Sequence, residues 1–128
     1  MNRRHITSGT TWEQEVGYSR AVCVGSEIHV SGTTATAADG TLVGIDDPYR
    51  QTRQAISNVE DALEEAGSSL DEVVRTRLYV VDIDDWEEIG RAHREAFDVA
   101  RPATSMVQVE RLVDSEMLVE IEVDARTD

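Results

Sequence analysis

Glu120 is the residue whose type and position best suit it to chemistry on a small molecule. It lies in residues 117–124, where apolar and polar side chains alternate as in a half-buried β-strand, and Glu122 shares its polar face. A carboxylate on a strand is ordinarily just solvated, and that interpretation is open here. If the face is covered instead, removal from water raises the pKa of the carboxyl group and suits it to general-base catalysis.

Metal and thiol chemistry are not expected. The histidines lack the spacing of metal ligands, and the acidic cluster before one predicted helix lacks the glycine and bidentate glutamate of a calcium loop. The single cysteine, Cys23, alternates with valines and is expected to be inert, and it cannot form an intrachain disulfide. The histidines are His5, His29 and His93, and the acidic cluster is Asp82, Asp84 and Asp85.

The charge of the chain is strongly one-sided. Twenty-six acidic residues face 12 basic residues, which gives a formal net charge of −14, and every basic residue is arginine. Acid-rich, lysine-free surfaces suit high salt, where screening removes self-repulsion. A halophilic source and a genome that favours arginine codons both explain this composition, and the sequence leaves the two open.

Composition also limits partners and location. Binding to nucleic acid needs a basic footprint, and no cluster of arginines supplies one. No apolar run is long enough to span a bilayer, and residues 1–12 lack the apolar centre of a signal peptide. We therefore predict one domain, residues 1–128, in a cytoplasmic protein that binds neither nucleic acid nor membrane.

Short strands are predicted from apolar runs. Gly25-Ser26 separates two of them, which predicts a hairpin, and residues 36–44 are typical of a turn or flexible loop. Ser69 and Glu72 have the spacing of a capping box over a single turn. In the strand that follows, the residues expected to be buried are Val74, Leu78 and Val80. The predicted strands are residues 21–24, 27–31, 73–81, 104–111 and 117–124.

Two helices are predicted between these strands. The first begins at Asp46-Asp47, has Pro48 just inside it and ends at Gly67. The second is capped by Asp84 or Asp85 and cannot continue through Pro102. The expected buried faces are Ile56, Val59, Leu63 and Ala66 in the first helix, and Trp86, Ile89, His93, Ala96 and Phe97 in the second.

This order of elements predicts an α+β fold with both helices on one face of a mixed sheet. The other face would then expose residues such as Leu118 and Tyr79. Self-association through that face is the expected way to cover them, so we predict an oligomer.

The chain resembles the RidA family, the reactive intermediate deaminases also called the YjgF family. The resemblance covers nearly the whole chain and rests on several motifs taken together. These are Tyr18-Ser19-Arg20-Ala21-Val22, Val30-Ser31-Gly32, Gln51-Thr52-Arg53-Gln54 with Asn58-Val59, residues 66–74, Arg101-Pro102-Ala103, and Val119-Glu120-Ile121-Glu122.

The resemblance implies a chorismate-mutase-like fold with a six-stranded sheet, assembled as a homotrimeric barrel with small-molecule clefts between subunits. It implies hydrolysis of reactive enamines or imines without a cofactor, with a glutamate on the last strand, here Glu120, positioning or deprotonating water. It also implies that an arginine after the Pro-Ala pair binds the substrate carboxylate. Family positions expected to bind substrate are Tyr18, Gly32, Thr33, Gly90, Thr104 and Met106.

The sequence departs from this pattern at the carboxylate-binding arginine, which is Thr104 here. A threonine offers one hydroxyl and no charge, so two hydrogen bonds to a charged group, worth roughly 1.5–3 kcal/mol each, would be lost. Arg101 precedes a proline in an expected exposed loop and is a poor substitute. Gly90 and Thr33 also stand where deaminases commonly have asparagine and glutamine.

Two functions remain open on these grounds. In the first, Glu120 hydrolyses an enamine, imine or related C–N bond of a ligand without a carboxylate. In the second, the protein is a non-catalytic trimer that binds a small metabolite and has lost deaminase activity. A ribonuclease role is disfavoured by the negative charge.

Overall fold

Six strands form one mixed sheet in the order β1-β2-β3-β6-β4-β5, in which β4 and β5 pair parallel and the other neighbours pair antiparallel. The computed structural model describes residues 2–127. The strands are β1 (Arg3–Ile6), β2 (Ala21–Val24), β3 (Glu27–Thr33), β4 (Val73–Val80), β5 (Ala103–Gln108) and β6 (Val119–Arg126). The helices are α1 (Thr11–Val16), α2 (Pro48–Glu65) and α3 (Trp86–Phe97), with 3-10 turns η1 (Leu70–Glu72) and η2 (Ile83–Asp85).

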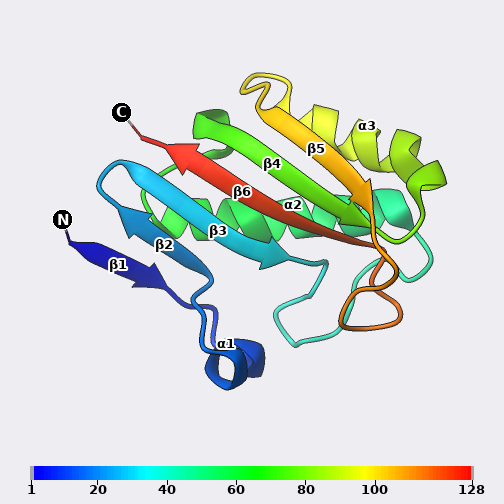
Figure 1. The fold of residues 1–128 in the computed structure, drawn as a ribbon, viewed down its shortest axis with the longest axis horizontal. Coiled ribbons are helices and arrows are strands. Elements are labelled where there is room, and N and C mark those ends of the chain that lie inside the picture. The colour runs from blue at the N-terminus through cyan, green and yellow to red at the C-terminus, as the bar shows by residue number, and fades with distance from the viewer. Residues whose placement is uncertain (1, 128) are drawn as a thin grey trace.

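Helices α2 and α3 lie side by side on one face of the sheet, as Figure 1 shows. This arrangement confirms the expected α+β architecture with two long helices on one face. The short helix α1 lies beyond the end of β1 and β2 and was not predicted (Figure 1). Strand β1, which pairs with β2 at one edge of the sheet, was missed as well, because its residues alternate too weakly to indicate a strand.

Helix α2 follows its sequence signals closely. Pro48 occupies the first turn, the side chain of Asp47 accepts a hydrogen bond from the backbone N–H of Arg50, and Gly67 takes a positive φ of 87° just after the helix. Its buried residues include Ile56, Val59 and Leu63 as expected. These side chains pack on the covered face of the sheet and form the centre of the core.

Helix α3 corrects one predicted face. Trp86, the first helical residue, is 56% exposed, whereas Ile89 and Phe97 are buried as predicted and Ala92 completes the face. Asp85 occupies the N-cap position but its side chain makes no capping bond. The capping side chain is that of Asp82, which accepts from the N–H of Asp84 at the start of η2.

Two local predictions before and within β4 were wrong. Glu72 receives its side-chain hydrogen bond from Ser68 and not from Ser69, so the expected capping box does not form. Val74 is 52% exposed because the pairing of β4 with β6 shifts register between Val73 and Arg75, which turns Val73 toward the core instead. From Thr76 onward β4 alternates as predicted.

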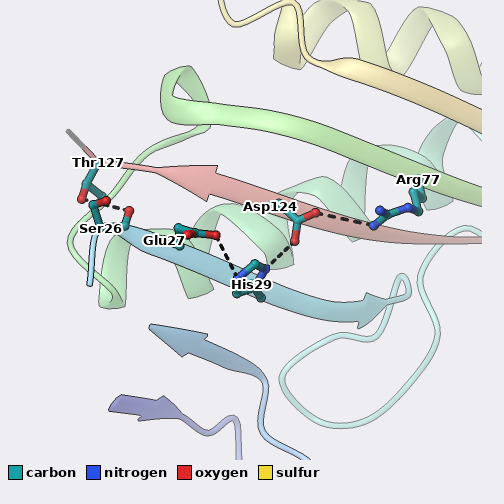
Figure 2. A network of polar contacts seen from close by, with 6 residues as sticks. All are labelled: Ser26, Glu27, His29, Arg77, Asp124 and Thr127. Atoms are coloured by element: carbon teal, nitrogen blue, oxygen red, sulfur yellow. Dashed lines mark hydrogen bonds and ion pairs between the residues drawn. The ribbon is translucent and has the colours of Figure 1, made fainter. Parts of the chain in front are cut away.

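Tyr79 lies on the uncovered face of the sheet as predicted, beside Val107 of β5, but polar and charged side chains of β6 share this face. Tyr79 is only partly exposed, and its hydroxyl donates to Glu122. The face also carries a network in which His29 lies between Glu27 and Asp124, and Arg77 contacts Asp124 from the next strand (Figure 2). Alternation along β6 places Glu120, Glu122 and Asp124 together on this face.

Two amide side chains, one buried and one partly buried, hold the long loops against α2. Gln51 is fully buried, donates to the carbonyls of Gly44 and Glu116, and accepts from the N–H of Leu118. Asn58 donates to the carbonyls of Thr34 and Thr36. These side chains satisfy backbone groups that regular structure leaves unpaired, so they fix the segments at both ends of the region around Glu120.

Candidate functional site

Glu120 lies in the middle of the uncovered face, half-buried, with Tyr79 of β4 as its cross-strand neighbour. Burial raises the pKa of the Glu120 carboxyl above its ordinary value, the nearby charge of Glu122 raises it further, and Arg20 opposes the rise. No hydrogen-bond partner is seen for its carboxylate among residues 2–127. A half-buried carboxylate with a raised pKa and free lone pairs has the properties of a general base.

Gly32 lies directly against this carboxylate. A methyl group built on Gly32 would lie 1.9 Å from Oε2 of Glu120, so only glycine leaves room for the side chain as it stands. A register shift between Val30 and Thr33 in the pairing of β3 with β6 creates this approach. The structure therefore brings together two of the predicted site residues, Gly32 and Glu120.

Arg20 completes this group and was missed as a site residue by the sequence analysis. Its Nη2 donates to the carbonyl oxygen of Gly32 at 2.6 Å, and its Nε is buried with no hydrogen-bond partner among residues 2–127. Burial lowers the pKa of its guanidinium, while the charge of Glu120 acts in the opposite direction. The sequence gives little signal for this role, because Arg20 has no local feature that distinguishes a half-buried arginine from a solvated one.

Glu13 is a second carboxylate near Arg20, and it is structural. It is 6% exposed and accepts from the backbone N–H and hydroxyl of Ser8 and from the hydroxyl of Thr10. Burial raises its pKa, but these hydrogen bonds outweigh that effect and hold the pKa below its ordinary value. Glu13 thus stabilises the segment before α1. Tyr18, which follows the end of α1, is 36% exposed.

Thr33 is placed away from Glu120. It is 2% exposed, pairs with the core residue Ile121, and its hydroxyl donates to the carbonyl of Ser31. Its side chain is therefore on the covered face, where it stabilises the irregular end of β3.

Thr104 lies on the opposite side of the sheet from Glu120. Its hydroxyl is 2.8 Å from that of Thr76, which is fully buried on the covered face, three residues before Tyr79 on β4. Residues three apart on a strand point to opposite faces. Thr76 in turn lies 2.9 Å from Nε2 of His93 on α3.

The other predicted binding residues lie on this second side. Met106 is partly buried and packs against the core, and Gly90 is on α3 with open space where a side chain would be. Arg101 cannot substitute for the missing arginine in this conformation, because its guanidinium donates to the carbonyl and side chain of Asp98. It has a positive φ of 48° and an exposed side chain, as expected for a loop.

The structure thus separates the candidate site residues into two groups that one chain does not bring together. Group 1 is Tyr18, Gly32 and Glu120 with the additional residue Arg20, and group 2 is Gly90, Thr104 and Met106. Thr33 belongs to neither group. A hollow of about 190 Å³ lies beside group 2, lined by His93, Arg94, Phe97, Asp98, Arg101 and Pro102. A second hollow of about 330 Å³ lies between α2 and α3 and is lined by neither group.

Within residues 2–127, no three His, Cys, Asp or Glu side chains are arranged so that they could hold a metal ion. His29, the histidine with the most acidic neighbours, is bonded to Asp124 at 2.7 Å in the network of Figure 2. Among the described helices, none has the length and apolar character needed to cross a membrane.

Comparison with known proteins gives consistent matches over the chain. The model of the family described as Endoribonuclease L-PSP matches residues 10–127. An uncharacterised protein of Streptomyces coelicolor is 41% identical over 122 residues, covering 95% of this chain and 90% of that protein. A RutC family protein of Pyrococcus abyssi is 34% identical over 82% of each chain.

Solved structures agree with these matches. The crystal structure of a Mycobacterium tuberculosis protein, a member of the YjgF/YER057c/UK114 family, has a TM-score of 0.90 and 46% identity, covering 98% of this chain and 100% of that one. The structure of Escherichia coli TdcF with bound serine has a TM-score of 0.79 and 27% identity, covering 87% and 88% of the two chains.

Proposed function

Because the chain belongs to the Endoribonuclease L-PSP family, also called the YjgF or RidA family, we propose that it hydrolyses a reactive enamine, imine or related C–N bond. In the proposed complex, the part of the ligand that faces Thr104 is not a carboxylate. The observation that carries the proposal is the half-buried Glu120, whose raised pKa and unoccupied lone pairs suit it to accept a proton from water.

The proposed reaction follows from the groups around Glu120. The carboxylate takes a proton from water as the water oxygen forms a bond to the imine carbon, and the C=N electron pair takes up a proton from solvent at nitrogen. Glu120 then returns its proton to the amine nitrogen of the resulting carbinolamine. The C–N bond breaks as the hydroxyl group releases its proton to solvent, and a carbonyl compound and ammonia leave. The positive charge of Arg20 favours the ionised form of Glu120 that starts this sequence.

Assembly of two or more copies is part of the proposal. Groups 1 and 2 lie on opposite sides of the sheet, so a cleft that uses both needs group 1 of one copy and group 2 of another. Exposed apolar side chains support such an interface: Val107 on β5 is 47% exposed, and Trp12 and Val16 on α1 are 49% and 69% exposed. A closed ring of three copies is the symmetry that we propose.

Ammonia release from a panel of freshly generated imines tests the proposal. We expect activity in the native protein and a loss of roughly 100- to 10,000-fold in Glu120→Gln, because general-base catalysis contributes about that factor. Glu122→Gln is the matched control on the same strand face. Equal rates for native protein and Glu120→Gln would exclude Glu120 as the base.

The second candidate is a non-catalytic trimer that binds a small metabolite. It is favoured by Thr104, which supplies no charge to hold an anionic substrate. Under this alternative no imine in the panel releases ammonia faster with the native protein than with buffer, and Glu120→Gln changes ligand affinity alone. RNA is a poor partner for either candidate, since a chain with a net charge of −14 repels phosphates.

A further inference from the structure

Thr104 is the end of a chain of three polar contacts that begins in the protein interior. Nε2 of His93 lies 2.9 Å from the hydroxyl of Thr76, and that hydroxyl lies 2.8 Å from the hydroxyl of Thr104. The hydroxyl of Thr104 lies 3.0 Å from the carbonyl oxygen of Pro102. Thr76 is fully buried and His93 is half-buried, so water does not compete freely for these groups.

The direction of these hydrogen bonds is fixed by the carbonyl at one end. A carbonyl oxygen can only accept, so the single hydroxyl hydrogen of Thr104 is donated to Pro102. The hydrogen between the two threonines must then come from Thr76. Since Thr76 has no second hydrogen, the contact with His93 requires an N–H at Nε2 of the imidazole. In this arrangement the N–H of His93 and the hydroxyl hydrogens of Thr76 and Thr104 are each donated once.

The consequence for Thr104 is that its hydroxyl has no hydrogen left to donate. Of its two lone pairs, one accepts from Thr76 and one is free. The residue is exposed on β5, so the free lone pair is accessible to a ligand. A carboxylate, which only accepts hydrogen bonds, finds no donor in this hydroxyl, whereas an N–H or O–H group finds an acceptor.

We propose that Thr104 selects ligands that present a hydrogen-bond donor, such as a primary amide or an amine, where an arginine would select a carboxylate. This inference rests on the proposed function only in assuming that Thr104 lines the ligand cleft. It names the class of substrate: an imine or enamine whose carboxyl group is replaced by an amide or another N–H-bearing group.

The state of His93 gives a test that needs no ligand. Burial lowers the pKa of His93 and so favours the neutral ring, which has one protonated nitrogen. We expect ¹⁵N NMR of histidine-labelled protein to show the hydrogen on Nε2, and Thr76→Val to abolish that preference. If the hydrogen is on Nδ1 in the native protein, the assigned direction of these hydrogen bonds is wrong and the proposal is overturned.

Ligand preference is tested with two probes that differ by one group, pyruvamide and pyruvate. Titration monitored by NMR should show tighter binding of pyruvamide to the native protein. Thr104→Ser should keep that preference, and Thr104→Val, which has the same size without the hydroxyl, should weaken pyruvamide binding roughly two- to tenfold. Thr104→Arg should reverse the preference toward pyruvate.

Tighter or equal binding of pyruvate by the native protein, or no effect of Thr104→Val on pyruvamide, would overturn the proposal, as would binding of neither probe. These outcomes are separable from failure of the proposed function. Glu120-dependent ammonia release without a pyruvamide preference removes this inference and keeps the hydrolase. A pyruvamide preference without ammonia release keeps this inference and favours the non-catalytic protein.

Discussion

The two faces of the sheet are built from the same strands but differ in what they hold. On β4, Leu78 is 1% exposed and packs under the helices, while the adjacent Tyr79 points to the uncovered face and bonds to Glu122. The covered face supplies the apolar burial that stabilises the fold. The uncovered face holds charged groups at partly buried positions, which cost stability and are expected where a protein has a function to perform.

Breaking the covered face should have the largest effect on stability. Leu78→Ala is expected to lower the free energy of unfolding by about 2–5 kcal/mol, because it leaves a cavity in a closed core. Tyr79→Phe, the neighbouring change on the other face, should cost about 0.5–1.5 kcal/mol for one hydrogen bond. Urea unfolding of both variants measures the contrast, and similar losses would show that the two faces contribute alike.

Gly32→Ala should separate stability from activity. The added methyl group meets the end of the flexible Glu120 side chain, which can swing away, so we expect the free energy of unfolding to change by less than about 1 kcal/mol. Ammonia release should nevertheless fall as far as in Glu120→Gln. For stability, Gly90→Ala is the matched control: it faces open space in a helix and should gain about 0.5–1 kcal/mol. Activity that survives Gly32→Ala would contradict the proposed placement of the carboxylate.

Glu120 should make stability depend on pH in a defined direction. Its pKa is raised in the folded protein, so between the ordinary and the raised pKa the folded state binds more protons than the unfolded state. The contribution of Glu120 to stability is therefore full below the ordinary pKa and is lost as pH rises through the raised pKa. Glu120→Gln should be more stable than the native protein at neutral pH, with the difference disappearing in acid. Urea unfolding across pH measures it, and a difference that grows in acid would contradict the assigned shift.

Arg20 should act on the pH dependence of the rate. Removing its positive charge in Arg20→Met is expected to raise the pKa of Glu120 further, so the acid limb of the pH–rate profile should move to higher pH. Arg20→Lys, which keeps the charge, should leave the limb near its native position. A lower rate in Arg20→Met with an unmoved acid limb would assign Arg20 a purely structural role.

The smallest effect is expected at the exposed network of Figure 2. Asp124 contacts His29 at 2.7 Å and Arg77 at 3.5 Å, but the side chains of both partners are about half exposed. Asp124→Asn should therefore change the free energy of unfolding by about 1 kcal/mol or less, and added salt should shrink the difference. Thermal unfolding at low and high salt checks this. A loss of stability as large as that of Leu78→Ala would show that the network stabilises the fold as much as a buried core residue does.

The covered face could be predicted from the sequence because its signals are local. Asp47, Pro48 and Gly67 bound α2, and apolar spacing identifies the buried residues of both long helices. The uncovered face could not be predicted in the same way. The contact of Gly32 with Glu120 depends on a register shift between strands distant in sequence, and Arg20 has no local feature that distinguishes a half-buried arginine from a solvated one.

The same limit applies to Thr104. The sequence shows that an arginine is missing, but it does not show that the hydroxyl is already bonded to Thr76 and Pro102. Its place on the opposite side of the sheet from Glu120 follows from the pairing of β4 with β5, because residue 104 faces Thr76 in that register. Pairing between strands is a property of the whole fold, so single-residue patterns do not reveal it.

The irregular pairing of β3 also has a consequence for engineering. A regular strand could be grafted onto another sheet by copying its alternation, but the shift between Val30 and Thr33 brings Gly32 against Glu120 while Thr33 keeps its side chain in the core. Transplanting Arg20, Gly32 and Glu120 into a scaffold with straight strands would scatter them. A designer would have to transfer the one-residue irregularity as the unit of function and let the three side chains follow from it.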